Sequence, residues 1–302
     1  MKKGNDSAIL KVRNGNKESG LNGEDAMSKV LCSTGALIGR PNGRDFRLLE
    51  PLANRLKCDG FEFMMYSDWY ERIEEVMTFL QEKAFCIPVV HCQKSVGEFI
   101  SKGGEDNFKE AFRRFELNCT LAEQIGAKKL VMHLWDGETS DKHFQNNVDA
   151  YARVSEISKN HGLDLLVENV VCNQKDPMQH WCELAEKYPD IQFVFDTKMA
   201  AFHSQLDLLY QDEYAWLWKE GHIRHYHVND YGGGHMDWKN LKTLPMGKGH
   251  VDFDKFFAHV KTTGYDECFT VESTAFDSTG AVDVDMLNAQ FEKIKNYTTP
   301  AK

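Results

Sequence analysis

The sequence lacks the features of a membrane protein, a secreted protein or a basic nucleic-acid-binding protein. Its 302 residues contain no apolar run near the roughly 20 residues that a helix needs to cross a bilayer. The opening MKKG is not followed by the apolar segment of a signal peptide. The formal net charge of −10 disfavours a protein whose main task is to hold nucleic-acid phosphates. We therefore expect a cytoplasmic protein with neither a membrane nor a nucleic acid as its partner.

The eight cysteines include no Cys-x-x-Cys pair. Several lie within apolar, strand-like segments such as KVLCSTGAL and CFTVES. Free cysteine is commonly a buried residue, and this pattern fits reduced thiols better than a disulfide framework or a cysteine zinc site. We interpret the cysteines as structural.

The first 26 residues are rich in Lys, Asn, Gly and Glu and poor in apolar residues. Such a segment cannot bury enough apolar surface to offset the entropy lost on ordering. We expect residues 1–26 to form a disordered leader and residues 27–298 to form one folded domain.

After this leader, short apolar segments alternate with helical patterns. The segment DWYERIEEVMTFLQEK, for example, repeats its apolar residues at steps of three and four, which is typical of an amphipathic helix. Gly or Pro often marks the return to the next apolar segment. The predicted strands are residues 29–35, 60–65, 87–92, 128–135, 163–169, 191–197, 223–230 and 268–273.

Eight strand–helix units over about 270 residues match the count and length of an α/β fold of the (β/α)8 type, the TIM barrel. A doubly wound open sheet is the alternative α/β architecture. However, the segment GALIGRPNG after the first strand lacks the Gly-x-Gly-x-x-Gly fingerprint, and no Walker A motif is present. The sequence therefore predicts a single-domain (β/α)8 barrel.

Metal-ligand side chains recur at or near the C-terminal ends of the predicted strands. Because strand side chains alternate in direction, those that point inward would converge on one mouth of the barrel. In this fold that mouth is where the active site is built. The six residues are His91, His133, Glu168, Asp196, His227 and Glu272.

Taken singly, each of these residues has a structural explanation. A lone strand histidine is usually hydrogen-bonded in the core, as we interpret His225, and a lone strand-end acid usually caps a helix. Together, however, three carboxylates and three imidazoles would carry a large desolvation cost without a cation. Mixed nitrogen and oxygen donors suit Mn²⁺, Zn²⁺, Co²⁺ or Fe²⁺. The set expected to hold the ion is Glu168, Asp196, His227 and Glu272.

Five ordered motifs, and a Pro-x-Gly-x-Gly-x-x-Asp stretch at 245–252, resemble those of the xylose isomerase-like TIM barrels. This family includes sugar phosphate isomerases and epimerases, inosose dehydratases and endonuclease IV, and the resemblance covers residues 28–297. It implies that the four residues above form the family's metal site. His91 and His133 resemble histidines that hold a further zinc in the endonuclease branch, so they are expected to form a second site or to contact the substrate. The motifs are LLVEN, FVFDT, HYHVND, LPMGKGHVDFDKFF and FTVES.

The sugar-acting branch implies a divalent-metal-dependent isomerase or epimerase of a sugar, sugar acid or sugar phosphate. The ion, Mn²⁺, Zn²⁺ or Co²⁺, would stabilise an enediolate while carboxylates exchange protons with carbon. Glu168 and Glu272 are the expected pair of catalytic carboxylates, because they come from strands on different sides of the metal. Lys198 is expected to protonate or orient a substrate oxygen, with an ion pair to a neighbouring acid as the alternative.

Further residues are expected to bind the carbohydrate. Arg40 and Arg44 could clamp a phosphate or carboxylate, or they could be ordinary loop residues. Trp135 could stack on a sugar face, or it could pack in the core. His133 could contact the substrate, and Asn169, beside a ligand, is expected to orient that ligand and to reach the substrate.

Three other functions compete with this hypothesis. An inosose-type dehydratase begins with the same proton transfer and then expels a hydroxyl group. An endonuclease IV-like phosphodiesterase is disfavoured, because the endonuclease branch has a histidine where this chain has Met199 and an Asp-x-His pair where this chain reads NLKTLPMGKG. A non-catalytic barrel that only binds a sugar or a partner would have little use for the full ligand set. The resemblance also implies a homo-oligomer, since relatives are often dimers or tetramers.

Overall fold

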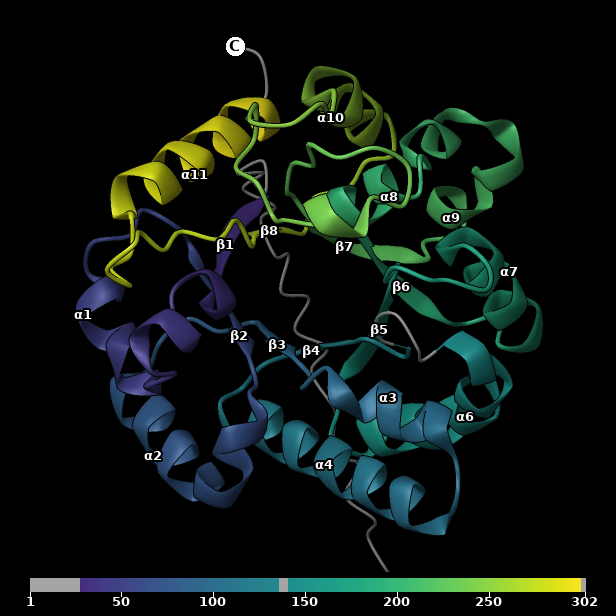
Figure 1. Ribbon diagram of the computed structural model, residues 1–302, viewed down its shortest axis with the longest axis horizontal. Helices are drawn as coiled ribbons and strands as arrows, with labels where there is room; N and C mark the ends of the chain where they lie inside the picture. Colours follow the sequence, from purple (N-terminus) through teal and green to yellow (C-terminus); the bar gives the residue numbers. More distant parts are fainter. Residues whose placement is uncertain (1–27, 136–140, 300–302) are drawn as a thin grey trace, which may run out of the picture.

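The computed structural model describes residues 28–135 and 141–299. Eight parallel strands form a closed barrel in sequence order (Figure 1), which confirms the predicted fold. Each strand lies within a segment that the sequence predicted. The strands are β1 (Lys29–Ser33), β2 (Gly60–Met64), β3 (Val89–His91), β4 (Lys129–Met132), β5 (Asp164–Glu168), β6 (Gln192–Asp196), β7 (Ile223–His227) and β8 (Cys268–Val271).

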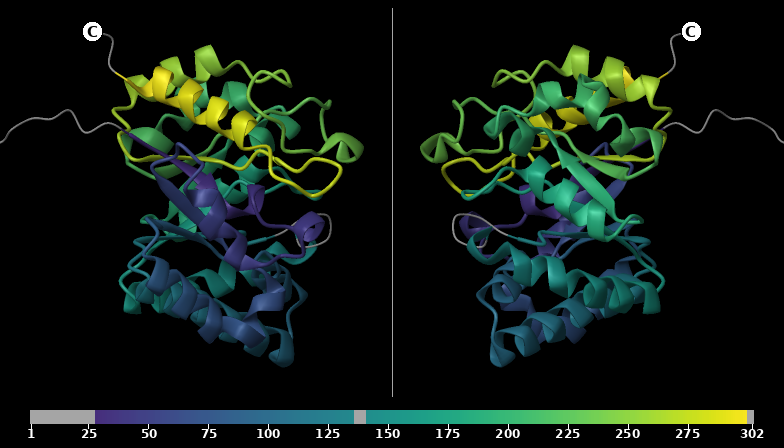
Figure 2. Two further views of the ribbon diagram at one scale, coloured as in Figure 1. Left: turned by 90° about the vertical axis from the view of Figure 1, so that its left-hand side faces the viewer. Right: turned by 90° about the vertical axis from the view of Figure 1, so that its right-hand side faces the viewer.

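Helices cover the outside of the barrel, and the longer loops gather at one of its ends (Figure 2). The apolar spacing of the sequence gives these helices their inner faces; in α2, for example, Ile73, Val76, Met77 and Leu80 are buried. The helices are α1 (Leu49–Ala53), α2 (Ile73–Lys83), α3 (Ser95–Lys102), α4 (Glu105–Gln124), α6 (Phe144–Asn160), α7 (Pro177–Lys187), α8 (Thr197–Phe202), α9 (Trp216–Lys219), α10 (Phe253–Thr262) and α11 (Val284–Thr298).

The inside of the barrel is layered. One layer is apolar and fully buried, and it consists of Leu31, Val89, Val131, Leu166 and Val194. Because inward-facing residues recur every second position along a strand, the next layer toward the C-terminal ends is occupied by the residues two positions later. In four of these strands those residues are His91, His133, Glu168 and Asp196, so the alternation that buries the apolar layer also places the predicted ligands above it.

The sequence also led to expectations about membrane-spanning helices, the leader and the cysteines. No helix within residues 28–135 and 141–299 is both long and apolar enough to cross a membrane. The predicted leader, residues 1–26, lies outside the described residues. All eight cysteines are free, and four of them are buried as expected, but Cys86 and Cys182 are exposed.

Candidate metal centre

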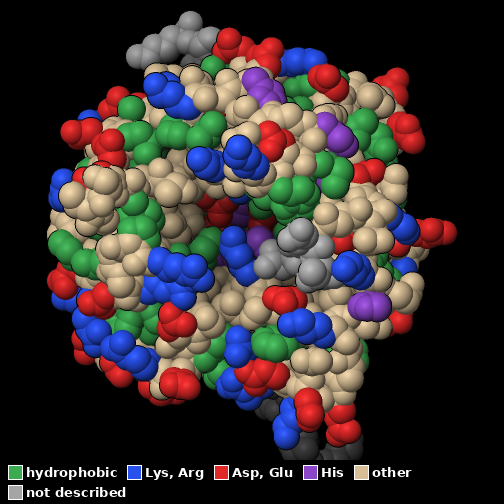
Figure 3. All heavy atoms as spheres, in the orientation of Figure 1, with side chains coloured by type: hydrophobic (Ala, Val, Ile, Leu, Met, Phe, Trp, Pro, Cys, Tyr) green, Lys and Arg blue, Asp and Glu red, His purple; other side chains and the backbone are tan. Residues whose placement is uncertain are grey.

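A cavity of about 300 Å³ opens at the C-terminal ends of the strands. Figure 3 shows it as a hollow at the centre of this face, with acidic and histidine side chains at its bottom and basic side chains at its rim. Its lining includes His133, Glu168 and Glu272 from the ends of β4, β5 and β8, together with Lys198 from α8. The cavity therefore lies where a barrel of this kind builds its active site.

A larger hollow of about 700 Å³ lies at the opposite end of the barrel, between α6 and the loops before β5 and β6. Its ionisable side chains, such as Glu156, Lys159 and Lys187, are exposed to solvent. Exposed charges of this kind keep their hydration and gain no special chemistry. The C-terminal cavity is therefore the candidate site.

The four predicted metal ligands meet beside this cavity. Glu168, Asp196 and His227 are the last residues of β5, β6 and β7, and Glu272 follows β8 directly. Each contributes one donor atom, and these four atoms all lie within 4.8 Å of one another. The first three side chains are buried, and that of Glu272 is 13% exposed.

His227 is the centre of this group. Its Nδ1 atom lies 3.2 Å from Oε1 of Glu168, 3.5 Å from Oε2 of Glu272 and 3.9 Å from Oδ2 of Asp196. Burial would lower the pKa of His227, but its carboxylate neighbours, of which Glu272 contributes most, raise the pKa well above its usual value. A lone pair on Nδ1 would face three carboxylate oxygens, so this buried position requires a positive charge, either a proton or a cation.

The carboxyl group of Asp196 lies in the same cluster of negative charge. Burial raises its pKa to about 6; the positive charge of Lys198 opposes this rise, and the charges of Glu168 and Glu272 add to it. A divalent cation among one imidazole nitrogen and three carboxylate oxygens would relieve this repulsion, and this donor set is one that Mn²⁺, Zn²⁺, Co²⁺ and Fe²⁺ accept. The residues present therefore fit a metal.

Glu168 joins this group to a second one. Its Oε2 atom lies 2.8 Å from Nε2 of His133 and 3.3 Å from Nε2 of His91. Burial opposes the charged form, but the positive charges of His227 and His133 outweigh it, so the pKa of Glu168 lies well below its usual range. The two predicted histidines thus share one carboxylate with the four-residue centre, and their ligand atoms also lie within 4.8 Å of one another.

Two asparagines hold the ligands in place. Asn229 Nδ2 donates to Oδ2 of Asp196 at 3.1 Å and to Oε2 of Glu272 at 3.3 Å, and Asn229 Oδ1 accepts the backbone N–H of Glu272. Asn169 Oδ1 accepts the backbone N–H of Asp196, and its Nδ2 donates to the backbone carbonyl of the same residue. Asn169 is fully buried and holds the backbone of Asp196, and its role in orienting a metal ligand or reaching the substrate stays a prediction.

The family model of the xylose isomerase-like TIM barrel matches residues 51–290 of the sequence. The chain belongs to this family. A comparison with curated protein sequences finds no match.

Solved structures share the fold of this xylose isomerase-like barrel. The IolI protein with a bound zinc atom has a TM-score of 0.67 and 15% identity, over 90% of this chain and 100% of that chain. D-allulose 3-epimerase from Methylomonas sp. in complex with D-allulose has a TM-score of 0.62 and 15% identity, over 90% and 98%. The apo form of 3-keto-D-glucoside 4-epimerase, YcjR, from E. coli has a TM-score of 0.62 and 15% identity, over 89% and 99%. At this identity the likeness shows the fold.

Trp135 packs in the core of this xylose isomerase-like barrel, which is one of the two roles expected for it. The predicted strand ran to residue 135, but β4 ends at Met132 and the chain then leaves the barrel wall. Trp135 is fully buried, donates its indole N–H to the carbonyl of Val170 at 2.9 Å and packs against Phe144 of α6. It is therefore a core residue rather than a platform for a sugar ring.

The basic residues predicted for the site differ in position. Lys198 lines the cavity, is 8% exposed and donates from Nζ to Oγ1 of Thr243 at 3.1 Å. Arg40 is exposed, and Arg44 pairs with Asp68 at 2.8 Å. Neither arginine lines the cavity. Their expected role as an anion clamp stays a prediction.

Several site residues were missed by the sequence reasoning. Lys94 and Tyr66 line the cavity, and Glu62 contacts His227 from β2. The sequence carried one signal for Glu62, namely a glutamate in the middle of the otherwise apolar segment GFEFMM. Lys94 and Tyr66 lie in loops after β3 and β2, where the sequence shows no pattern that separates them from ordinary loop residues.

Proposed function

We propose that this protein is a divalent-metal-dependent isomerase or epimerase that acts on a sugar, sugar acid or sugar phosphate. One observation carries the proposal, namely the buried Nδ1 of His227 facing three carboxylate oxygens beside a cavity of about 300 Å³. A cavity of this size lies at the lower end of the range for small-molecule sites. The shared fold with solved sugar epimerases supports the same class of substrate.

The residues that would hold the metal are Glu168, Asp196, His227 and Glu272. When bound there, a divalent cation would supply positive charge that stabilises the negative charge developing on substrate oxygens.

Glu168 and Glu272 are the proposed pair for proton transfer. They lie at the ends of β5 and β8, which β6 and β7 separate, so their carboxylates reach the cavity from different directions. Glu168 is ionised, since its pKa is lowered, and the ionised form is the one that can accept a proton. One carboxylate would remove a proton from a substrate carbon and the other would return one to its opposite face.

Lys198 is proposed to bind a substrate oxygen. Its ammonium group is held at the cavity by Thr243, and this hydrogen bond uses one of the three N–H donors of the nitrogen. An ammonium donor near a developing alkoxide favours the charged form of that oxygen. His133, which also lines the cavity, is proposed as a second substrate contact or as part of a further metal site.

Carbon-bound proton exchange in deuterated water tests this function. The metal-loaded protein is incubated with a panel of ketoses, aldoses, sugar acids and sugar phosphates, and deuterium in the recovered sugar is measured by NMR. We expect incorporation at a carbon beside a carbonyl, and a loss of about 10²- to 10⁴-fold in Glu168→Gln and in Glu272→Gln. Glu156→Gln, a change of an exposed glutamate on α6, is the matched control and should leave exchange unchanged.

Undiminished exchange in Glu168→Gln at full metal occupancy would contradict the proposed role of that carboxylate. The recovered product also separates the alternatives, because an inosose-type dehydratase would release water and yield a less oxygenated product. An endonuclease IV-like activity is not favoured, since Met199 lines the cavity. The cytoplasmic location and the homo-oligomeric state stay predictions from the sequence.

A further inference from the structure

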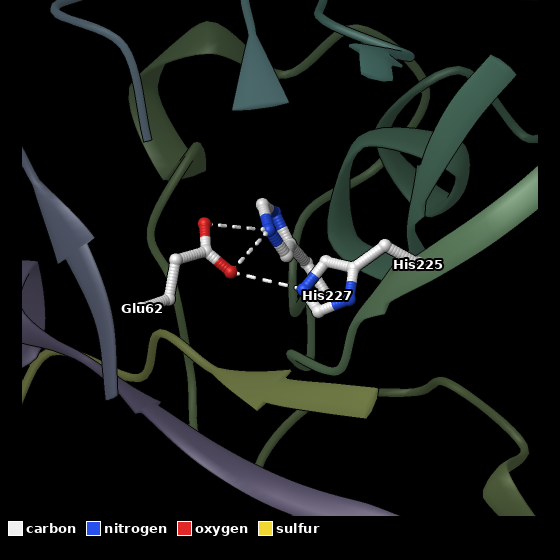
Figure 4. A group of neighbouring side chains, drawn as sticks. All are labelled: Glu62, His225 and His227. Carbon is white, nitrogen blue, oxygen red and sulfur yellow. Dashed lines mark hydrogen bonds and ion pairs between the residues drawn. The ribbon is translucent and has the colours of Figure 1, made fainter. Parts of the chain in front are cut away.

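The metal-binding histidine has a second partner on its other nitrogen. Nε2 of His227 lies 3.1 Å from Oε1 and 3.2 Å from Oε2 of Glu62, a residue of β2 (Figure 4). Glu62 also contacts Nε2 of His225 at 2.9 Å and accepts a hydrogen bond of 2.7 Å from Oγ1 of Thr270. All four side chains are fully buried. Glu62 does not line the cavity, so it has no direct access to a substrate there.

The register of the barrel explains this arrangement. His225 pairs with Val194 and His227 pairs with Asp196, so His225 lies in the apolar layer and His227 in the ligand layer above it. Both imidazoles point into the barrel, because they are two residues apart on one strand. Glu62 reaches both rings from the opposite wall, as Figure 4 shows.

The chemistry of a carboxylate fixes the hydrogen positions. An ionised carboxylate can only accept hydrogen bonds, so the ring nitrogens that face Glu62 must carry the hydrogens. This assigns an Nε2–H to His227. The other nitrogen, Nδ1, faces the place where Glu168, Asp196 and Glu272 converge, and it carries a proton there unless a cation takes the proton's place. With a cation bound, Nδ1 would be the nitrogen that offers its lone pair, because Nε2 keeps its hydrogen toward Glu62.

We propose that Glu62 is a positioning residue for the metal centre, which holds His227 by its Nε2–H so that Nδ1 is the metal-binding atom. Its negative charge also makes the imidazole a stronger donor toward a cation, as carboxylates behind metal-binding histidines do. His225 and Thr270 fix the carboxylate in turn, because they occupy its Oε2 atom. The inference rests on the metal centre of the proposed function and is independent of the substrate.

The surroundings of the buried carboxylate of Glu62 support this positioning role. Its hydrogen-bond donors are two imidazoles and one hydroxyl. Removing a carboxylate from water without full compensation costs free energy, so a purely structural position would be served as well by an apolar residue. A role in positioning a metal-binding histidine explains why a charged carboxylate is buried here despite its desolvation cost.

The experiment measures the affinity for Zn²⁺ alone, by competition of the metal-free full-length protein with a chromophoric chelator. We expect Glu62→Gln to bind Zn²⁺ about 10- to 100-fold more weakly than the wild type. Glu267→Gln is the matched control, since it removes a partly buried carboxylate that pairs with Lys129 and Arg224 at the other end of the barrel. This control should bind Zn²⁺ as the wild type does.

A second measurement needs no variant at Glu62 to fold. In the zinc-loaded wild type, ¹⁵N NMR of the histidine side chains, with His227 assigned by its absence in His227→Asn, should show a hydrogen on Nε2 and none on Nδ1. Binding of zinc through Nε2, an equal Zn²⁺ affinity in Glu62→Gln, or no Zn²⁺ binding by the wild type would each overturn the inference. Zinc binding that depends on Glu62 without any sugar proton exchange would instead uphold the inference and refute the proposed function.

Discussion

At the scale of single residues, the centre is a small set of buried groups whose charges do not balance. His227 contacts Glu62 through Nε2 and three further carboxylates through Nδ1. The pKa values of these groups move in opposite directions, that of His227 upward and those of Glu62 and Glu168 downward, because each favours the charge of the other. Asp196 is the exception, since its pKa rises to about 6 and burial is the main cause.

This exception gives a prediction for the stability of the metal-free protein. Between the unfolded pKa of 3.8 and the folded pKa of about 6, folded Asp196 holds a proton that the unfolded chain has lost. The free energy of unfolding should therefore decrease as the pH rises through this range, by an amount on the order of 3 kcal/mol. Urea unfolding of the metal-free protein across pH 4 to 6 measures it, because this interval is set by the two pKa values.

Asp196→Asn supplies the comparison for this measurement, since an amide does not titrate. We expect the decrease with rising pH to be smaller in the variant than in the wild type. The lowered pKa values of Glu62 and Glu168 act in a lower range, because their contribution is lost as the pH falls below 4.5. Equal slopes for the two proteins would mean that Asp196 is not perturbed in this way.

At the scale of strands and loops, β7 explains the run of histidines in IRHYHVND. Alternation points His225 and His227 inward, while Tyr226 points outward and packs on Phe256 and Phe269. This part of the site could be predicted, because side chains alternate in direction along a strand and the polar residues at the strand ends can be seen in the sequence. The contact with Glu62 could not, since its partners His225 and His227 are 163 and 165 residues away and only barrel closure joins them.

The loop after β7 carries the Pro-x-Gly-x-Gly motif and is held by one carboxylate. Asp230 Oδ2 accepts the backbone N–H groups of Gly247 and Gly249, each at 2.8 Å, and Oδ1 accepts that of Val251 at 3.0 Å. The same loop supplies Thr243, which positions Lys198 at the cavity. The close packing of this loop therefore helps to hold Lys198 at the cavity.

Gly249→Ala tests this packing. A Cβ atom at Gly249 would lie 2.2 Å from the carbonyl oxygen of Tyr231, so the loop must shift. We expect a loss of about 1–3 kcal/mol in the free energy of unfolding, typical of overpacking, measured by chemical denaturation. Gly234→Ala, in the same loop with nothing within 4 Å of the added carbon, is the control. Equal stability of the two variants would show that the approach to Tyr231 does not matter.

At the scale of the whole molecule, barrel closure converts eight separate strand ends into one mouth. The count of eight units and the position of the strands followed from the sequence, because each strand is a short apolar run with a polar end. The loop residues that line the cavity did not follow, as Lys94 and Tyr66 illustrate, since the direction of a loop side chain depends on contacts that no local pattern records. The ligand layer and the cavity lie at the same end of the barrel, which is the end where this fold builds its active sites.

The metal content of the purified protein, measured by elemental analysis together with thermal unfolding, tests the central claim most directly. We expect at least about one transition-metal ion per chain, and a rise in melting temperature when Mn²⁺, Co²⁺ or Zn²⁺ is added to the metal-free protein. His227→Ala should lose this ion and the rise. A wild-type protein without bound metal, whose melting temperature none of these ions changes, would contradict the account, because the buried carboxylates around His227 would then be balanced by protons alone.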